Sequence, residues 1–336
     1  MVTVPETLGR LLPGVGLLVL VGLVARWLAG VVGVNHLVVA IALGILVANT
    51  VGVPGWAESG LDTQTLWLET GIVLMGSKLS VDAVLESGPR IVGLVVATIL
   101  FTGLLVELCT RWLFGIEEKL GSLLAAGSSI CGVSAVIAVS GSIRAKEDQI
   151  AYAVATVLLF DAVTVFAYPL VGGLLDLPAQ VYGVWAGLSM YSTGPVVAAG
   201  FAHSDVAGQW ATVTKITRNL FIAVVALGYS VLYARRGGDD ADASLGYLWS
   251  TFPKFLVGFL GVVVLANVGV FSEPQLASLE NAYQWLFLVA FAGLGLSITT
   301  DDLREAGPRP VGVMGAVLLV VSTVSLAVVS LLFATA

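Results

Sequence analysis

Long apolar runs alternate with short polar turns along the whole chain. A helix that crosses a membrane needs about 20 mostly apolar residues, and eleven runs are candidates for this role. The eleven predicted segments lie near residues 11–29, 34–51, 61–79, 90–113, 120–142, 148–174, 181–202, 209–234, 247–270, 276–299 and 308–334. Strands of a membrane barrel would instead alternate apolar and polar residues over about 10 positions. The pattern predicts an all-α, polytopic membrane helix bundle of ten or eleven hydrophobic segments.

Composition supports a membrane environment. The chain is 58% hydrophobic and 11% charged, whereas soluble domains average about 25% charged residues. A lipid bilayer accepts apolar side chains on the outer surface of the bundle. Because no long polar insertion interrupts the segments, we expect residues 1–336 to form a single transmembrane domain. The net charge of −7 argues against nucleic acid as a partner.

The basic residues leave the number of crossings open. If all eleven segments cross, Lys and Arg divide almost evenly between the two faces of the membrane. If segment 181–202 enters and returns on the same side, five basic loops share one face, which is the arrangement that the positive-inside rule favours. This segment is interrupted by the run Ser192-Thr193-Gly194-Pro195.

Two stretches of the chain repeat. Eight residues of 76–93 recur at 295–312, 219 positions later, and both copies read as a helix end, an acidic turn, Gly-Pro-Arg and a new helix. Repeated units, often inverted, are typical of secondary transporters, whose substrate sites lie where the repeats meet. The alternative is that one kind of interfacial turn arose twice.

Two polar stretches break otherwise apolar segments, at 127–135 and 189–198, and they overlay at an offset of 60 residues. Backbone that leaves the helix in a bilayer persists only where it is buried in protein or lines a cavity. We therefore expect two discontinuous helices whose ends form a solute site. The candidate substrate-binding residues are Ser128, Ser129, Cys131, Gly132, Ser134, Ser189, Tyr191, Ser192, Thr193 and Gly194. Close helix packing through small residues is the alternative.

Charged residues within the apolar segments add candidates. Lys215 and Arg218 share one helix face, beside Asn219, and could attract an anion, although long basic side chains also extend to the membrane interface. Asp161 and Glu69 are candidates for binding a coupling ion, because a carboxylate in the membrane is costly unless it faces protein or water. Asp161 could equally accept hydrogen bonds from a neighbouring helix.

Other chemistry finds little support. Cys131 could act as a nucleophile, but no His or carboxylate stands at motif spacing to activate it. The two histidines, His36 and His203, lie far apart and give no metal spacing. No nucleotide-binding glycine loop is present. We therefore predict no metal site, no cofactor and no enzymatic activity.

The motif Gly127-Ser128-Ser129-Ile130-Cys131-Gly132-Val133-Ser134-Ala135 is similar to one in the YeiH-type family of bacterial and archaeal membrane proteins, usually labelled sulfate exporters. Weaker matches are Val196–Gly200, Lys215–Arg218, Pro253–Phe255, Gly258-Phe259 and Gly293–Leu296. The family is grouped with the bile acid/arsenite/riboflavin transporter-like superfamily. The resemblance covers nearly the whole chain and implies two related five-helix halves, helices broken at a central site, and a multi-pass protein of a prokaryotic cell membrane.

The chain departs from the family pattern where relatives show Ile-His-Glu, because it has Met190-Tyr191-Ser192 there. Asp161 stands where relatives tend to have a small residue and could compensate. We expect a secondary transporter or facilitator of a small anion, with sulfate or an organosulfur acid as the solute that the resemblance suggests. An intramembrane thiol enzyme using Cys131 and a non-transporting receptor or scaffold stay open, as does a homo-oligomer.

Overall fold

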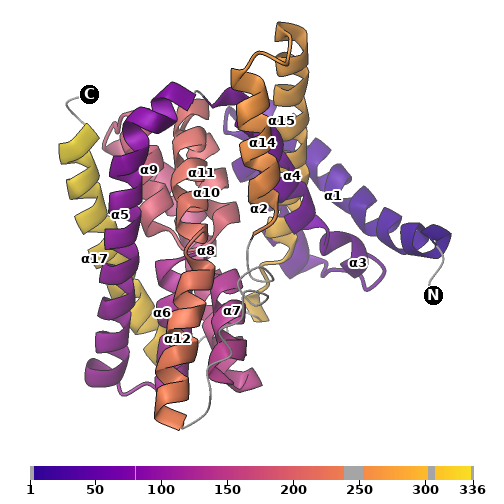
Figure 1. Ribbon diagram of the computed structural model, residues 1–336. Helices are drawn as coiled ribbons and strands as arrows, with labels where there is room; N and C mark the ends of the chain where they lie inside the picture. Colours follow the sequence, from indigo (N-terminus) through magenta and orange to yellow (C-terminus); the bar gives the residue numbers. More distant parts are fainter. Residues whose placement is uncertain (1–3, 80, 238–252, 302–306, 334–336) are drawn as a thin grey trace. The chain divides into compact units, whose positions relative to one another are not determined.

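The computed structural model describes residues 4–79, 81–237, 253–301 and 307–333, and these residues contain helices and no strand, so the all-α prediction is confirmed (Figure 1). The helices are α1 (Val4–Val32), α2 (His36–Thr50), α3 (Glu58–Leu61), α4 (Gln64–Met75), α5 (Val81–Leu108), α6 (Glu118–Ser129), α7 (Val133–Ile143), α8 (Glu147–Leu174), α9 (Ala179–Ser189), α10 (Thr193–His203), α11 (Asp205–Asn219), α12 (Ile222–Gly237), α14 (Phe255–Asn267), α15 (Glu273–Leu296) and α17 (Pro308–Phe333).

Five helical stretches in the described part of the chain are long and apolar enough to cross a membrane. They are Gly9–Val32, Gly88–Leu113, Glu147–Leu174, Asp205–Tyr233 and Pro308–Phe333. Large apolar side chains on them stay exposed, such as Leu104 at 63% and Leu319 at 70%. Exposure of this kind suits a surface that faces lipid.

The chain folds into two compact units. The first comprises Met1–Glu86 and Lys254–Thr300. In it, α2 and α15 approach so closely that a Cβ at Gly44 would lie 2.7 Å from the Ala292 carbonyl oxygen. The Asn49 amide joins the same two helix ends, because it donates to the Ile298 carbonyl over 2.9 Å. Glu69 lies on α4 of this unit and is half-buried.

The second unit comprises Ser87–Pro253 and Asp301–Ala336. A buried apolar cluster joins α6, α7, α8, α12 and α17, and includes Leu124, Val136 and Val317. A second buried cluster packs α9, α10 and α11 together around Tyr182, Trp185 and Ala211. The structure thus places both of the predicted broken segments in one unit.

The predicted segment 120–142 is a hairpin that enters and returns, and not a crossing helix. Its two arms are α6 and α7, and Lys119 at the start of α6 donates to the carbonyl of Arg144, just past the end of α7, over 2.8 Å. A straight segment would hold these residues apart by the length of both arms. The sequence prediction of a crossing failed here because length and hydropathy are the same for a hairpin and a span.

The predicted segment 181–202 is a second hairpin, which agrees with the alternative in which it enters and returns on the same side. Its arms are α9 and α10, and the rings of Tyr182 and His203 stack 4.1 Å apart at its base. The His203 imidazole also contacts the Leu177 carbonyl at 3.1 Å. The two hairpins therefore have their bases at opposite ends of α8, whose 28 residues extend about 42 Å, and Figure 1 shows α6 and α7 at the lower end and α9 and α10 at the upper end.

The predicted repeat of 76–93 at 295–312 lies in part outside the described residues, because 80 and 302–306 are not described. Both copies lie where the chain passes from the first unit to the second. The copies differ in one respect: Pro89 lies inside α5, whereas Pro308 begins α17.

Candidate functional site

The tips of the two hairpins meet inside the second unit. The chain leaves the helix at Ile130–Gly132 in the first hairpin and at Met190–Ser192 in the second. Gly132 has φ 70° and ψ −129°, a conformation that is essentially restricted to glycine. A Cβ at this position would collide with the Ser192 hydroxyl, so glycine also allows the close approach of the tips. The arm α6 has 12 residues and is about 18 Å long, close to half the thickness of a bilayer core of about 30 Å.

Lys215 of α11 ties the two tips together. It is fully buried, and its ammonium donates to the carbonyls of Ile130 over 2.8 Å, Met190 over 3.0 Å and Tyr191. An ammonium has three donors and no acceptor, so three carbonyl partners match the charged form of this side chain.

Arg218, one turn further along α11, closes the C-terminal ends of α6 and α9. Its five hydrogen bonds go to the carbonyls of Ser128 (2.8 Å), Ser129 (3.2 Å), Gly187 (2.9 Å), Leu188 (2.6 Å) and Met190 (2.9 Å). A helix C-terminus carries a partial negative charge and unpaired carbonyls. The guanidinium therefore supplies both a positive charge and hydrogen-bond donors to the C-terminal ends of α6 and α9.

Asp161 of α8 interacts with the N-terminal end of a half-helix, α10. Its carboxylate accepts a hydrogen bond from the Ser192 backbone N–H over 3.1 Å, just before α10 begins. Among the described residues, the charged side chains that are buried are Asp161, Lys215 and Arg218. Each hairpin brings one helix C-terminus and one N-terminus to its tip, so the dipole charges largely cancel. The side chains leave a surplus of one positive charge.

The residues on the two sides of each hairpin tip differ in how exposed they are. On the side of the helix C-termini, Ser129 and Ser189 are buried. On the side of the N-termini, Thr193 is half-buried and Ser134 is exposed. The first N–H groups of α7 and α10 have no acceptor within their own helices. The ends of the half-helices that attract anions are therefore the accessible ones.

The side chains of several candidate residues bond within the unit. The hydroxyl of Ser128 donates to the Leu124 carbonyl over 2.8 Å, that of Ser129 to the Ala126 carbonyl over 3.4 Å, that of Ser189 to the Trp185 carbonyl over 2.6 Å, and that of Tyr191 to the Met314 carbonyl over 2.8 Å. Cys131 is buried at the tip, and His203 lies at the base of the other hairpin. Glu69 lies in the first unit.

Asn219 stands beside the tips and was noted from the sequence only as a neighbour of Arg218. Its amide N–H donates to the Thr193 hydroxyl over 3.1 Å, while its buried carbonyl oxygen has no hydrogen-bond partner. Buried polar atoms without partners are rare and costly. The position of Asn219, directly after Arg218 on the helix that serves both tips, is the signal that could have marked it.

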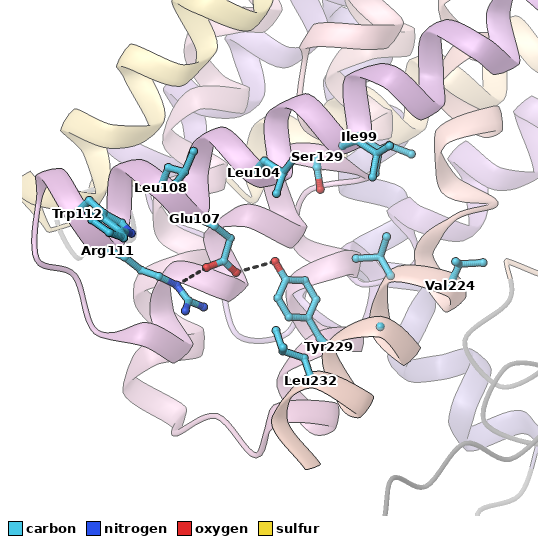
Figure 2. Close-up of a pocket in the computed structure, with 14 residues that line it drawn as sticks. Ile99, Leu104, Glu107, Leu108, Arg111, Trp112, Ser129, Val224, Tyr229 and Leu232 are labelled. Carbon is cyan, nitrogen blue, oxygen red and sulfur yellow. Dashed lines mark hydrogen bonds and ion pairs between the residues drawn. The ribbon is translucent and has the colours of Figure 1, made fainter. Parts of the chain in front are cut away.

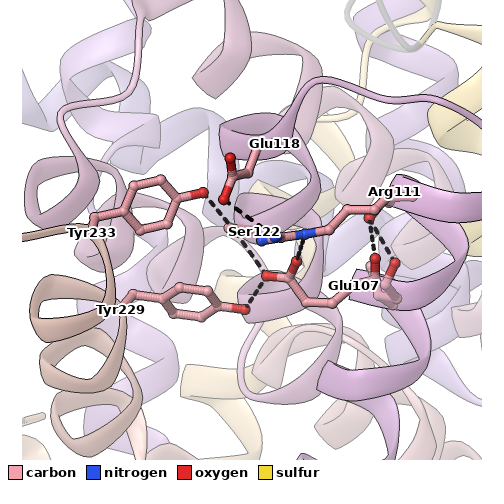
Figure 3. A network of polar contacts seen from close by, with 8 residues as sticks. Glu107, Arg111, Glu118, Ser122, Tyr229 and Tyr233 are labelled. Atoms are coloured by element: carbon pink, nitrogen blue, oxygen red, sulfur yellow. Dashed lines mark hydrogen bonds and ion pairs between the residues drawn. The ribbon is translucent and has the colours of Figure 1, made fainter. Parts of the chain in front are cut away.

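A second polar cluster, centred on Glu107 of α5, was missed from the sequence (Figure 3). The Glu107 carboxylate pairs with Arg111 over 2.7 Å and accepts hydrogen bonds from Ser122 over 2.7 Å and Tyr229 over 2.8 Å. Arg111 also pairs with Glu118 over 3.2 Å. The signal was available, because a Glu and an Arg four positions apart within an apolar segment are expected to pair.

A groove lies between α5 and α12 beside this cluster, with a volume of about 540 Å³ (Figure 2). Its lining is Ile99, Leu100, Gly103, Leu104, Glu107, Leu108, Arg111, Trp112, Ser129, Val224, Val225, Gly228, Tyr229 and Leu232. Apolar side chains dominate, and the charged ones gather at one end.

The chain is similar to a family of bacterial membrane proteins. The family model described as "Conserved hypothetical protein 698" matches residues 13–314. Two UPF0324 membrane proteins of Nitratidesulfovibrio vulgaris are 34% and 30% identical, covering 88% and 84% of this chain and 86% and 80% of their own. A UPF0324 membrane protein of Bacillus cereus is 29% identical and covers 91% of each chain.

Among solved structures, the sodium proton antiporter MjNhaP1 from Methanocaldococcus jannaschii aligns over 96% of this chain and 99% of its own, with 13% identity and a TM-score of 0.31. A score this low supports no conclusion about fold or activity. The family match and the sequence relatives confirm the YeiH-type resemblance and the membrane location. The chain belongs to the conserved hypothetical protein 698 family, together with the UPF0324 membrane proteins of bacteria.

Proposed function

We propose that this protein is a secondary transporter or facilitator of a small anion, with sulfate or an organosulfur acid as the first candidates. One observation carries the proposal: the N-terminal ends of α7 and α10 are accessible beside a buried surplus of positive charge. A positive charge without a counter-ion is costly at mid-depth of a membrane. An anion at the open side of the tips would neutralise it.

In this proposal the anion contacts backbone N–H groups and hydroxyls. Ser134 at the start of α7 and Thr193 at the start of α10 supply both kinds of donor. Lys215 and Arg218 do not contact the anion directly in this proposal, because their N–H groups already donate to carbonyls of the hairpin tips. They hold the tips together and raise the local potential.

We further propose that α5 with the first hairpin and α8 with the second form an inverted repeat. The arms α10 and α7 have the same bounds at an offset of 60 residues, and the hairpin bases lie at opposite ends of α8. A site between two hairpins that enter from opposite sides can open to either side in turn, as alternating access requires. Asp161 is then the first candidate for coupling to a cation or proton, and Glu69 of the first unit is the second.

The test is uptake of labelled sulfate and of a panel of small organic anions into proteoliposomes, under sodium and proton gradients. Ser134→Asp is the informative variant, because an acidic residue suits the first turn of a helix but repels an anion there. We expect flux to disappear while the thermal unfolding midpoint is unchanged or higher. Ser134→Asn is the control, because asparagine has the size of aspartate without its charge, and this variant should retain flux.

Removal of the cations is a second test. Lys215→Ala combined with Arg218→Ala should abolish flux, whereas Arg309→Ala, an exposed cation at the start of α17, should not. Unchanged flux in the double variant, or no anion transported under any gradient, would remove the anion proposal.

A further inference from the structure

The groove between α5 and α12 has the dimensions of a chain-binding site for one membrane leaflet. It runs from Trp112, in the π-helical turn Cys109–Leu113 that follows α5, to Ile99 of α5, a distance of about 20 Å at 1.5 Å per residue. Half of a bilayer, measured from the head-group region, is about 20 Å. The groove therefore extends from the interface to mid-depth and stops there, which fits one acyl chain and not a route across the membrane.

Two glycines on facing helices open the groove. An added Cβ at Gly228 of α12 would meet nothing within 4 Å, and one at Gly103 of α5 would meet only the Ser129 side chain, at 3.9 Å. The walls beside them are apolar and exposed, with Leu104 at 63% and Val224 at 60%. The empty space in front of both glycines is part of the 540 Å³ volume of the groove.

The charged side chains at the interface end of the groove determine which lipid head group fits there. Arg111 pairs with two carboxylates, Glu107 over 2.7 Å and Glu118 over 3.2 Å, so these three groups carry a net negative charge. Trp112, 85% exposed, stands at the same end, and an indole face attracts an ammonium. A purely anionic head group would meet this negative surplus, whereas an ammonium would be attracted to it.

We propose that the groove binds a phospholipid with an ethanolamine head group from the leaflet at this end of the second unit. One acyl chain lies between α5 and α12, the ammonium lies near Glu107, Glu118 and Trp112, and the phosphate lies on the Arg111 side. Bound there, the lipid bridges α5 and α12 on the surface where Glu107 and Tyr229 already join them (Figure 2).

The experiment is native mass spectrometry of the full chain, released from nanodiscs that contain equal parts of phosphatidylethanolamine and phosphatidylglycerol. The expected result is one retained phosphatidylethanolamine per chain. Gly228→Leu fills the groove and should lower retention roughly tenfold, the factor that 1.4 kcal/mol represents. Gly261→Leu on α14 of the first unit, where a Cβ also meets nothing within 4 Å, is the control and should retain the lipid.

The head group is tested separately. Glu118→Gln should remove the preference for phosphatidylethanolamine while chain binding persists, and its unfolding midpoint should match that of the wild type, because Glu118 is largely exposed. Equal retention of both lipids by the wild type, preference for phosphatidylglycerol, or full retention by Gly228→Leu would each overturn the proposal.

Discussion

The phenol ring of Tyr182 lies flat on the imidazole of His203, with 4.1 Å between the ring centroids and 8° between the planes. This stack closes the base of the second hairpin at one end of α8, and the Lys119–Arg144 hydrogen bond closes the first hairpin at the other end. The two ends of the unit differ in their number of Lys and Arg residues. Lys and Arg are more frequent at the Lys119 end, where Arg111, Lys119, Arg144, Lys146, Arg235, Arg236 and Arg309 stand among the acidic residues Glu107, Glu117, Glu118, Glu147 and Asp148. The positive-inside rule assigns that end to the cytoplasm.

Cysteine labelling tests this topology. In a chain whose two native cysteines are replaced by alanine, Glu117→Cys and Glu147→Cys should both resist a membrane-impermeant thiol reagent added outside the cell. Asp205→Cys should react with it. All three side chains are exposed, so permeabilised cells should label every variant. A crossing segment at 120–142 would put positions 117 and 147 on opposite sides, and opposite labelling of these two would contradict the hairpin.

Much of this architecture could be predicted from the sequence. Hydropathy predicted the helices, and the polar stretch around Gly132 marked the first break, because a bilayer penalises backbone that leaves the helix. The direction of the chain after the break could not be predicted, because the hydropathy of α7 is the same whether it continues or turns back. That depends on contacts such as Lys119 with the Arg144 carbonyl, 25 positions away.

The sequence predicted which residues lie at the site, but it did not predict what each residue does there. Lys215 and Arg218 were expected near a solute, and they lie at the tips. Their partners are carbonyls of two hairpins that are 60 positions apart in sequence, a pairing that no local pattern encodes. The pairing of Glu107 with Arg111 could have been predicted from their spacing, but the bonds of Glu107 to Ser122 and Tyr229 could not, because these residues lie 15 and 122 positions away.

Gly132→Ala should destabilise the protein and reduce flux. The substitution forces a side chain into φ 70° and against the Ser192 hydroxyl, and strain at such a position costs about 1–3 kcal/mol. Thermal unfolding in detergent gives the loss of stability, and proteoliposome uptake gives the loss of function.

Gly141→Ala on the same arm is the matched control, because a Cβ there meets nothing within 4 Å. Within a helix this change should be neutral or stabilising by up to about 1 kcal/mol. Equal behaviour of the two variants would show that the tip tolerates a side chain and that the contact with Ser192 is unimportant.

Arg218→Lys should fail to replace arginine. The guanidinium reaches two carbonyls of α6, two of α9 and that of Met190 through three nitrogen atoms, whereas an ammonium is a compact group with three donors. Each lost hydrogen bond to a charged group is worth about 1.5–3 kcal/mol, so the unfolding midpoint should fall markedly. Retention of both the midpoint and flux would show that the charge suffices and that the fork is not needed.

Asp161→Asn should separate binding from coupling. An asparagine oxygen can still accept the Ser192 N–H, so the start of α10 keeps its partner, but the buried positive surplus grows by one charge. Anion binding, measured by calorimetry on the purified protein, should therefore tighten. Uptake should lose its dependence on the sodium or proton gradient, because the group proposed to carry the coupling ion no longer ionises. Asp161→Ala leaves the Ser192 N–H without its acceptor and should lower stability as well. If Asp161→Asn keeps gradient-driven uptake at the wild-type rate, coupling depends on another group, and Glu69→Gln becomes the variant to measure.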